Sequence, residues 1–153
     1  MKVLLAIDGS PCSEAAVEEV AGRTWPPDSQ VRVISVVEPP APLVAEPYMG
    51  ATGYFEEAER VAKEQARTAV EQAGGLIRAR EAGALQVSAQ VLTGSAKRTI
   101  VEEADSWGAD LIVVGSHGYE TWERMLLGSV SQSVAAHARC SVLIVRSKGK
   151  CGG

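Results

Sequence analysis

Two glycine clusters enclose the segment of this chain whose residue types are best suited to chemistry. Residues 115–118 read Gly-Ser-His-Gly, nine residues follow, and residues 128–131 read Gly-Ser-Val-Ser. The apolar run at 110–114 before the first cluster is typical of a buried strand that is followed by a loop. Glycines let a backbone approach an anion or adopt positive φ, and a helix start offers unpaired N–H groups. The segment therefore predicts a phosphate site, with Ser129 and Ser131 capping the helix or donating to phosphate oxygens; the alternative is a turn without a ligand.

Length and composition indicate one compact domain. The chain has 153 residues and is 46% hydrophobic, so we expect a domain over 1–147 and a flexible tail over 148–153. A net charge of −4 and a pI near 5.2 argue against broad binding to nucleic acid or to anionic membrane. No apolar run is long enough to span a bilayer, and Asp8 interrupts the first one before it resembles a signal peptide. We expect a cytoplasmic protein.

The three cysteines form no recognisable framework. Cys12, Cys140 and Cys151 are widely spaced and include no C-x-x-C pair, so neither a disulfide scaffold nor a zinc site is predicted. We expect Cys12 and Cys140 to be buried or idle thiols. Cys151 lies in the polar tail, and nothing in the sequence assigns it a redox role.

Strand-like and helical segments alternate along the chain. Apolar or β-branched runs predict strands, and capped, alanine-rich or charged runs predict helices. The second expected helix, 54–80, is expected to break near Gly74-Gly75. Four prolines with two glycines between 38 and 53 indicate a surface loop. The expected strands are 2–8, 31–37, 85–92, 109–115 and 141–146, and the expected helices are 10–24, 54–80, 95–107 and 128–138.

This alternation predicts a doubly wound, Rossmann-like α/β domain with a five-stranded parallel sheet and four helices. In such sheets ligands bind at the carboxyl ends of the strands where the strand order reverses. In the order 3-2-1-4-5 the reversal falls between the first and fourth strands. Those strands end at residues 8–10 and 115–118, so the two most site-like segments would meet in one crevice.

Four motifs carry a resemblance to a known family. They are the opening run at 2–10, Val36-Val37 after the second strand, Leu92-Thr-Gly94 after the third, and the G-x-x-G, nine residues, G-S spacing. With these motifs the whole chain resembles the universal stress protein family and, by the last spacing, its ATP-binding branch. The resemblance implies an adenine nucleotide alpha hydrolase-like fold.

The resemblance also implies where ATP, or another adenine nucleotide, would lie. Asp8 would sit beside ribose and adenine, and the backbone around Val36 would read the adenine edge; the alternative for Asp8 is a turn former or a partner of the helix dipole. No catalytic residue and no metal site are implied, and Mg²⁺ is expected only with the nucleotide. The candidate binding residues are Ala6, Asp8, Ser10, Val36, Val37, Gly94, Val114, Gly115, Ser116, His117, Gly118, Gly128, Ser129, Val130 and Ser131.

Two histidines, one lysine and one arginine are further candidates for a role. No carboxylate, serine or cysteine stands at motif spacing from His117, so its backbone amide is expected to matter more than its imidazole. His137 is expected to be an ordinary residue at a helix end. Lys97 and Arg98 could face phosphate, but solvated surface charge is the expectation.

Two features depart from the family pattern. Glu120 and Glu123 lie in the nine-residue loop, where they would repel a polyphosphate unless Mg²⁺ or Arg124 intervenes. Ala96 stands where relatives often carry proline. The first departure bears on nucleotide affinity and on the number of phosphates bound, not on the fold.

Three functions follow as hypotheses. The first is an ATP-binding regulatory or stress-response protein with slow or no hydrolysis, because the P-loop motif G-x-x-x-x-G-K-[S/T] is absent from the sequence. The second is an enzyme on the same fold, a weak ATPase or a nucleotidyl- or phosphotransferase. The third is a dimeric interaction protein that binds no nucleotide. The sequence does not identify the protein on which a regulatory protein of this kind would act.

The last strand predicts a homodimer. It lies at a sheet edge in the expected order, and its four consecutive apolar residues, Val142, Leu143, Ile144 and Val145, would leave a row of N–H and C=O groups exposed. Pairing with the same strand of a second copy would satisfy that row.

Overall fold

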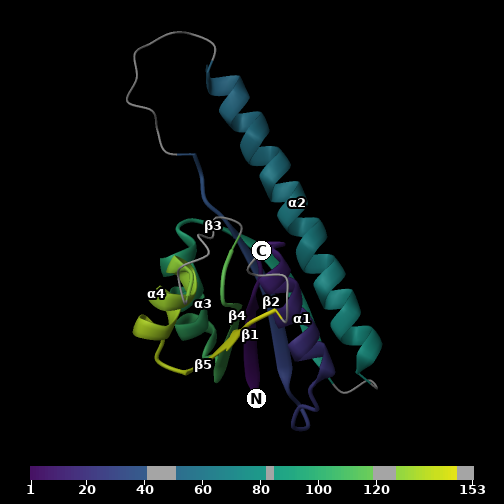
Figure 1. Cartoon of the computed structure of the whole chain (residues 1–153). Coiled ribbons are helices and arrows are strands. Elements are labelled where there is room, and N and C mark those ends of the chain that lie inside the picture. Colours follow the sequence, from purple (N-terminus) through teal and green to yellow (C-terminus); the bar gives the residue numbers. More distant parts are fainter. Residues whose placement is uncertain (41–50, 82–84, 119–126, 148–153) are drawn as a thin grey trace.

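The computed structural model describes residues 1–40, 51–81, 85–118 and 127–147. They form a five-stranded parallel sheet in the order β3-β2-β1-β4-β5 with two layers of helices (Figure 1), so the predicted fold class and strand order are confirmed. The elements are β1 (Lys2–Ala6), α1 (Pro11–Gly22), β2 (Gln30–Val37), α2 (Ala51–Arg80), β3 (Gln86–Thr93), α3 (Ala96–Trp107), β4 (Leu111–Gly115), α4 (Ser129–His137) and β5 (Ser141–Val145).

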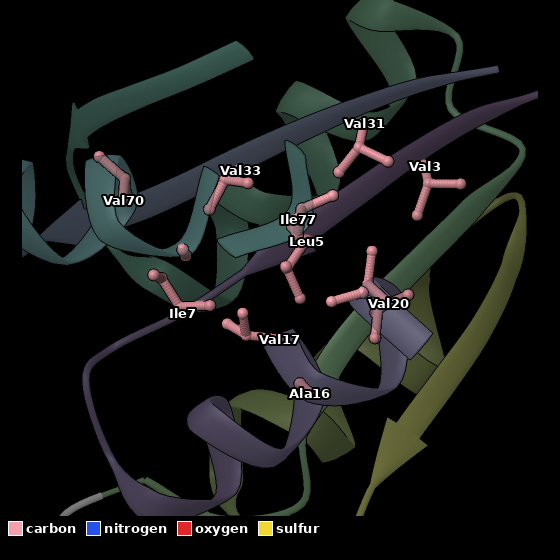
Figure 2. Close-up of a cluster of buried hydrophobic side chains, with 13 residues drawn as sticks. Val3, Leu5, Ile7, Ala16, Val17, Val20, Val31, Val33, Val70 and Ile77 are labelled. Carbon is pink, nitrogen blue, oxygen red and sulfur yellow. The ribbon is translucent and has the colours of Figure 1, made fainter. Parts of the chain in front are cut away.

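The central strand β1 is buried on both faces, which explains its nearly continuous apolar sequence. Val3 and Leu5 point toward α1 and α2, where they join a core that includes Val20 and Ile77 (Figure 2). Leu4, on the opposite face, joins a second core with residues of α3 and α4. The alternation of β1 side chains therefore anchors both helical layers to the same strand.

The helix α2 runs unbroken through Gly74-Gly75, so the expected break is wrong. Its C-terminal half contacts β2, β3 and α1, and Val70 and Ile77 are fully buried there. A Cβ on Gly74 would meet Val87 at 3.6 Å, an ordinary contact, so burial of one helix face outweighs the low helix propensity of glycine. The N-terminal half of α2 extends beyond the sheet (Figure 1).

The amino ends of the strands are closed by a polar cluster. Arg32 of β2 pairs with Glu103 of α3 at 2.5 Å and stacks 4.3 Å from the ring centre of Trp107. Lys2 donates to the carbonyl of Trp107 at 3.0 Å. A half-open cavity of about 220 Å³ lies beside Arg32 and Trp107, away from the carboxyl ends of the strands.

No helix in the described part of the chain is long and apolar enough to cross a membrane.

Candidate functional site

The turn after β1 is held by Asp8 and Ser10. Asp8 Oδ1 accepts a hydrogen bond from the amide of Ser10 at 2.9 Å, and Gly9 between them has φ of 79°. Ser10, which is buried, caps α1 as predicted: its hydroxyl accepts from the amide of Ser13 at 3.3 Å. The alternative role of Asp8 as a turn former is therefore confirmed for Oδ1.

The second oxygen of Asp8 faces the loop after β4. A Cβ built on Gly118 would stand 2.7 Å from Asp8 Oδ2, and the Ser10 hydroxyl donates to the carbonyl of His117 at 3.3 Å. The turn after β1 and the loop after β4 thus touch at the reversal of strand order, as the sequence predicted. Asp8 is exposed, so its Oδ2 can meet a ligand that enters between the two segments.

The glycines of the loop are required for close packing and not for positive φ. Positive φ occurs at Gly9, Gly94 and Gly108 among the described glycines, so the expected positive φ is wrong for Gly115, Gly118 and Gly128. A Cβ on Gly115 would lie 2.7 Å from the carbonyl carbon of Cys12, in the first turn of α1. On Gly128 it would lie 3.2 Å from the Ser116 carbonyl oxygen, so that position is tight as well.

Internal hydrogen bonds close the loop at its base. The amide of Gly128 donates to the carbonyl of Ser116 at 2.7 Å, and the Ser131 hydroxyl approaches the same oxygen at 3.0 Å and the Gly128 carbonyl at 2.9 Å. Ser131 is only 2% exposed. Its expected role as the helix cap is wrong, because Gly128 is the N-cap and the Ser131 hydroxyl bonds backbone carbonyls. Its contact with phosphate stays a prediction.

The start of α4 keeps backbone donors for a ligand. Its N-cap is Gly128, which has no side chain to cap the helix, so neither serine of this turn serves as N-cap. Ser129 is exposed and Val130 is half-buried in the first turn. The amides of an uncapped first turn, with the positive end of the helix dipole, suit an anion.

His117 has side-chain contacts that sequence reasoning did not find. Its Nδ1 lies 3.1 Å from the hydroxyl of Ser116, and that hydroxyl lies 3.5 Å from the sulfur of Cys12. The expectation of no serine or cysteine partner is therefore wrong: Ser116 is its neighbour in sequence, and β1 and β4 bring Cys12 close in space.

A second cluster lies at the ends of β2 and β3. Val37 accepts from the amide of Gly94 at 3.0 Å, and Glu38 Oε1 accepts from the amide of Ala96 at 2.9 Å. Glu38 therefore caps α3, where Ser95 makes no side-chain cap. Val36 and Val37 extend beyond the end of β1, since Ala6 pairs with Ile34. Their backbone therefore lies at the carboxyl end of the sheet.

The remaining candidates are either buried in the core or exposed on a helix. Ala6 and Val114 are buried in the core beneath α3 and α4. Arg98 pairs with Glu102 at 3.4 Å on an exposed part of α3, and Lys97 is exposed beside it. His137 is exposed at the end of α4, as expected.

Sequence reasoning missed three contributors to this site. Cys12 and Ser13 form the helix turn against which Gly115 packs, and Glu38 caps α3. An acidic residue directly after a predicted strand could have indicated Glu38. Nothing local marks Cys12 and Ser13, because their contact with Gly115 exists only once β1 and β4 are paired. Glu120, Glu123 and Arg124 lie outside the described residues.

The cysteines differ from expectation. Cys12 is disulfide-bonded, so its interpretation as an idle thiol is wrong, whereas Cys140 is free. Partial burial, together with the charges of Asp105 and Asp110, raises the pKa of the Cys140 thiol.

Among the described residues, no group of three or more histidine, cysteine, aspartate or glutamate side chains is arranged to hold a metal ion.

Comparison with known proteins finds relatives that match most of the chain. Universal stress protein MJ0531 of Methanocaldococcus jannaschii is 32% identical over 149 residues, covering 97% of this chain and 84% of the relative. A putative universal stress protein of Staphylococcus epidermidis is 31% identical over 147 residues, covering 95% and 84%.

Solved structures share the fold. The hypothetical protein MJ0577 superposes with a TM-score of 0.82 at 24% identity, covering 97% of this chain and 96% of that one. An Arabidopsis thaliana universal stress family protein with AMP bound gives 0.65 at 17% identity, covering 97% and 93%. A universal stress protein in complex with cAMP gives 0.61 at 24% identity, covering 97% and 98%. Residues 1–146 match the model of the "Universal stress protein family", and the chain belongs to that family.

Proposed function

We propose that this chain binds ATP in the crevice between the ends of β1 and β4 and acts as a nucleotide-responsive regulatory protein of the stress response. One observation carries the proposal. Asp8 Oδ2 and the backbone of Gly118 face each other at the switch point, beside an α4 start that no side chain caps. That arrangement would offer an acceptor for a ribose hydroxyl and amide donors for phosphate at the same end of the sheet.

Different residues would bind the adenine, the ribose and the phosphates of the nucleotide. The backbone of Val36 would pair with the adenine edge, since Ile34 and Val36 face the β1 side whereas the Val37 carbonyl accepts from Gly94. Asp8 Oδ2 would accept a ribose hydroxyl. The amides at the start of α4, with the exposed hydroxyl of Ser129, would bind phosphate oxygens. The AMP-bound and cAMP-bound relatives support an adenine nucleotide as the ligand.

We propose slow or no hydrolysis and a cation that arrives with the nucleotide. Slow hydrolysis is supported by the contact of the His117 imidazole, whose Nδ1 lies 3.1 Å from the Ser116 hydroxyl. Mg²⁺ would be held by phosphate oxygens and water, because the described residues offer no cluster of ligands for it.

Isothermal titration of ATP into the folded protein tests the proposal. Gly118→Val should abolish binding, because its Cβ would stand 2.7 Å from Asp8 Oδ2 and displace either the carboxylate or the loop. Gly22→Val is a matched control, since a Cβ on Gly22 meets nothing within 4 Å. Unchanged ATP affinity in a folded Gly118→Val protein would contradict the proposal. Phosphate release well above that of the Gly118 variant would favour an ATPase instead.

We also propose that two copies pair through β5. This strand is the sheet edge, and its four apolar residues from Val142 to Val145 are half-buried, not buried. An edge of this kind presents unpaired N–H and C=O groups, which an identical strand can satisfy across a two-fold axis.

A further inference from the structure

The strand β3 is the second open edge of the sheet, on the side opposite to β5. One side of β3 pairs with β2, and within the described residues no strand pairs with the other side. The amides of Gln86, at the start of β3, and of Gly94, directly after its end, both donate to backbone carbonyls on the β2 side. Backbone groups of successive residues in a strand point to opposite sides, so the odd-numbered residues of β3 face outward. A further strand could pair with their N–H and C=O groups.

A side chain of α2 occupies one of these outward carbonyls. Arg78 Nη2 donates to the carbonyl oxygen of Val87 at 3.0 Å. The guanidinium passes Gly74, since a Cβ on that glycine would lie 3.6 Å from both Nη1 and Nη2 of Arg78. Arg78 is exposed, so its charge meets water beside the strand. A cation at an open edge is one of the means by which sheets avoid pairing with another chain.

The outward groups of β3 would fit the same strand of a second copy. In an antiparallel pair centred on Ala89, each Val87 would lie opposite the Val91 of the other copy. All three side chains pack on the α1 and α2 side of the sheet, so apolar residues would meet apolar residues on that face. In this register the Val87 carbonyl would accept from the Val91 amide of the second copy. Arg78 competes for the same oxygen.

We propose that Arg78 keeps the β3 edge from pairing with a second copy and so confines self-association to β5. The limit on assembly size rests on the proposed pairing through β5. A chain that can pair through one edge stops at a dimer, whereas a chain that can pair through two edges adds copies at both and forms an open-ended series. Arg78 would therefore determine the size of the assembly from a position outside the β5 contact.

Sedimentation velocity over a range of protein concentrations tests the proposal. Arg78→Met keeps an unbranched side chain but removes the donors, so it should raise the weight-average mass at least about twofold over wild type, increasingly so with concentration. Arg80→Met is the matched control. Arg80 lies two residues further along α2 and pairs with Glu18 of α1, so this variant loses the same charge and leaves the Val87 carbonyl covered. Equal masses for the two variants would overturn the proposal.

A proline in β3 distinguishes edge pairing from unfolding. The Ala89 N–H faces outward, so Ala89→Pro removes a donor from the open edge and leaves the hydrogen bonds to β2 in place. Added to Arg78→Met, it should return the mass to that of wild type. This recovery would also exclude unfolding as the cause of the larger species, because proline does not repair a lost fold. Continued association of the double variant would contradict pairing through β3.

The same series separates failure of the β5 dimer from failure of the proposal on Arg78. If wild-type protein is a monomer, the β5 pairing is contradicted, and Arg78→Met should then form dimers that Ala89→Pro dissociates. If Arg78→Met is also a monomer, the role of Arg78 is contradicted as well. If wild type is a dimer, Ile144→Pro added to Arg78→Met should leave dimers that pair through β3, and monomers in that variant would contradict the proposal.

Discussion

Gly115 and Cys12 are packed backbone against backbone, with no room for a side chain between them. A Cβ on Gly115 would lie 2.7 Å from the Cys12 carbonyl carbon, 2.9 Å from its oxygen and 2.9 Å from the amide nitrogen of Ser13. The end of β4 therefore sets the position of the first turn of α1. Both walls of the proposed nucleotide crevice depend on this one contact.

Gly115→Ala should lower the free energy of unfolding by about 1–3 kcal/mol, because backbone cannot yield as a flexible side chain does. Gly75→Ala is the matched control. It lies inside α2 with nothing within 4 Å of a Cβ and should raise stability by about 0.5–1 kcal/mol. Urea unfolding of the two variants measures both changes. Equal effects at the two positions would contradict the packing argument.

Asp8→Asn should weaken ATP binding by about tenfold or more, since a hydrogen bond to a charged acceptor contributes about 1.5–3 kcal/mol. The amide oxygen of asparagine can still accept from Ser10, so stability should change by less than about 0.5 kcal/mol. Asp28→Asn, at an exposed position with φ of 61°, controls for the loss of one negative charge. Calorimetry and thermal unfolding separate the two effects. Equal ATP affinity in both variants would remove Asp8 from the site.

Glu103→Ala should destabilise the protein by about 1–3 kcal/mol, because Arg32 and Gln90 both lose a partly buried acceptor. Glu102→Ala removes an exposed pair with Arg98 on the same helix and should change stability by less than about 0.5 kcal/mol. Urea unfolding of both variants gives the comparison. A larger loss at Glu102 would show that burial does not decide the contribution of these ion pairs.

The proposed dimer can be tested at the open edge of β5. The Val145 carbonyl faces β4, where it accepts from Ser116, so the N–H and C=O of Ile144 face the open edge. Ile144→Pro removes an outward donor and should shift sedimentation toward monomer. Val145→Pro falls on the β4 side and should lower stability instead.

Leu143→Lys is a second variant at this edge that should favour the monomer. Thermal unfolding must show that each edge variant is folded before its sedimentation is compared with wild type. A wild-type protein that sediments as a monomer at micromolar concentration would rule out the dimer.

The sheet could be predicted because its information is local. Apolar runs such as that of β1 identify buried strands, and alternation with helices predicts a parallel sheet. In the order 3-2-1-4-5 such a sheet places Asp8 near Gly118. The roles of individual side chains could not be predicted in this way. Ser131 turns inward because the carbonyls of Ser116 and Gly128 lie within its reach, and this depends on where β4 ends. The continuity of α2 through its glycines likewise depends on burial against neighbouring elements.

The two halves of α2 are stabilised by different forces. The half that packs on the sheet depends on burial of Val70 and Ile77, whereas the projecting half is supported by ion pairs within the helix, from Arg60 to Glu57 and Glu64. Pairs between neighbouring turns contribute only a few tenths of a kcal/mol each. We therefore expect the projecting turns of α2 to unfold and re-form locally while the packed part of the domain stays folded. We expect the same turns to tolerate shortening or an appended label.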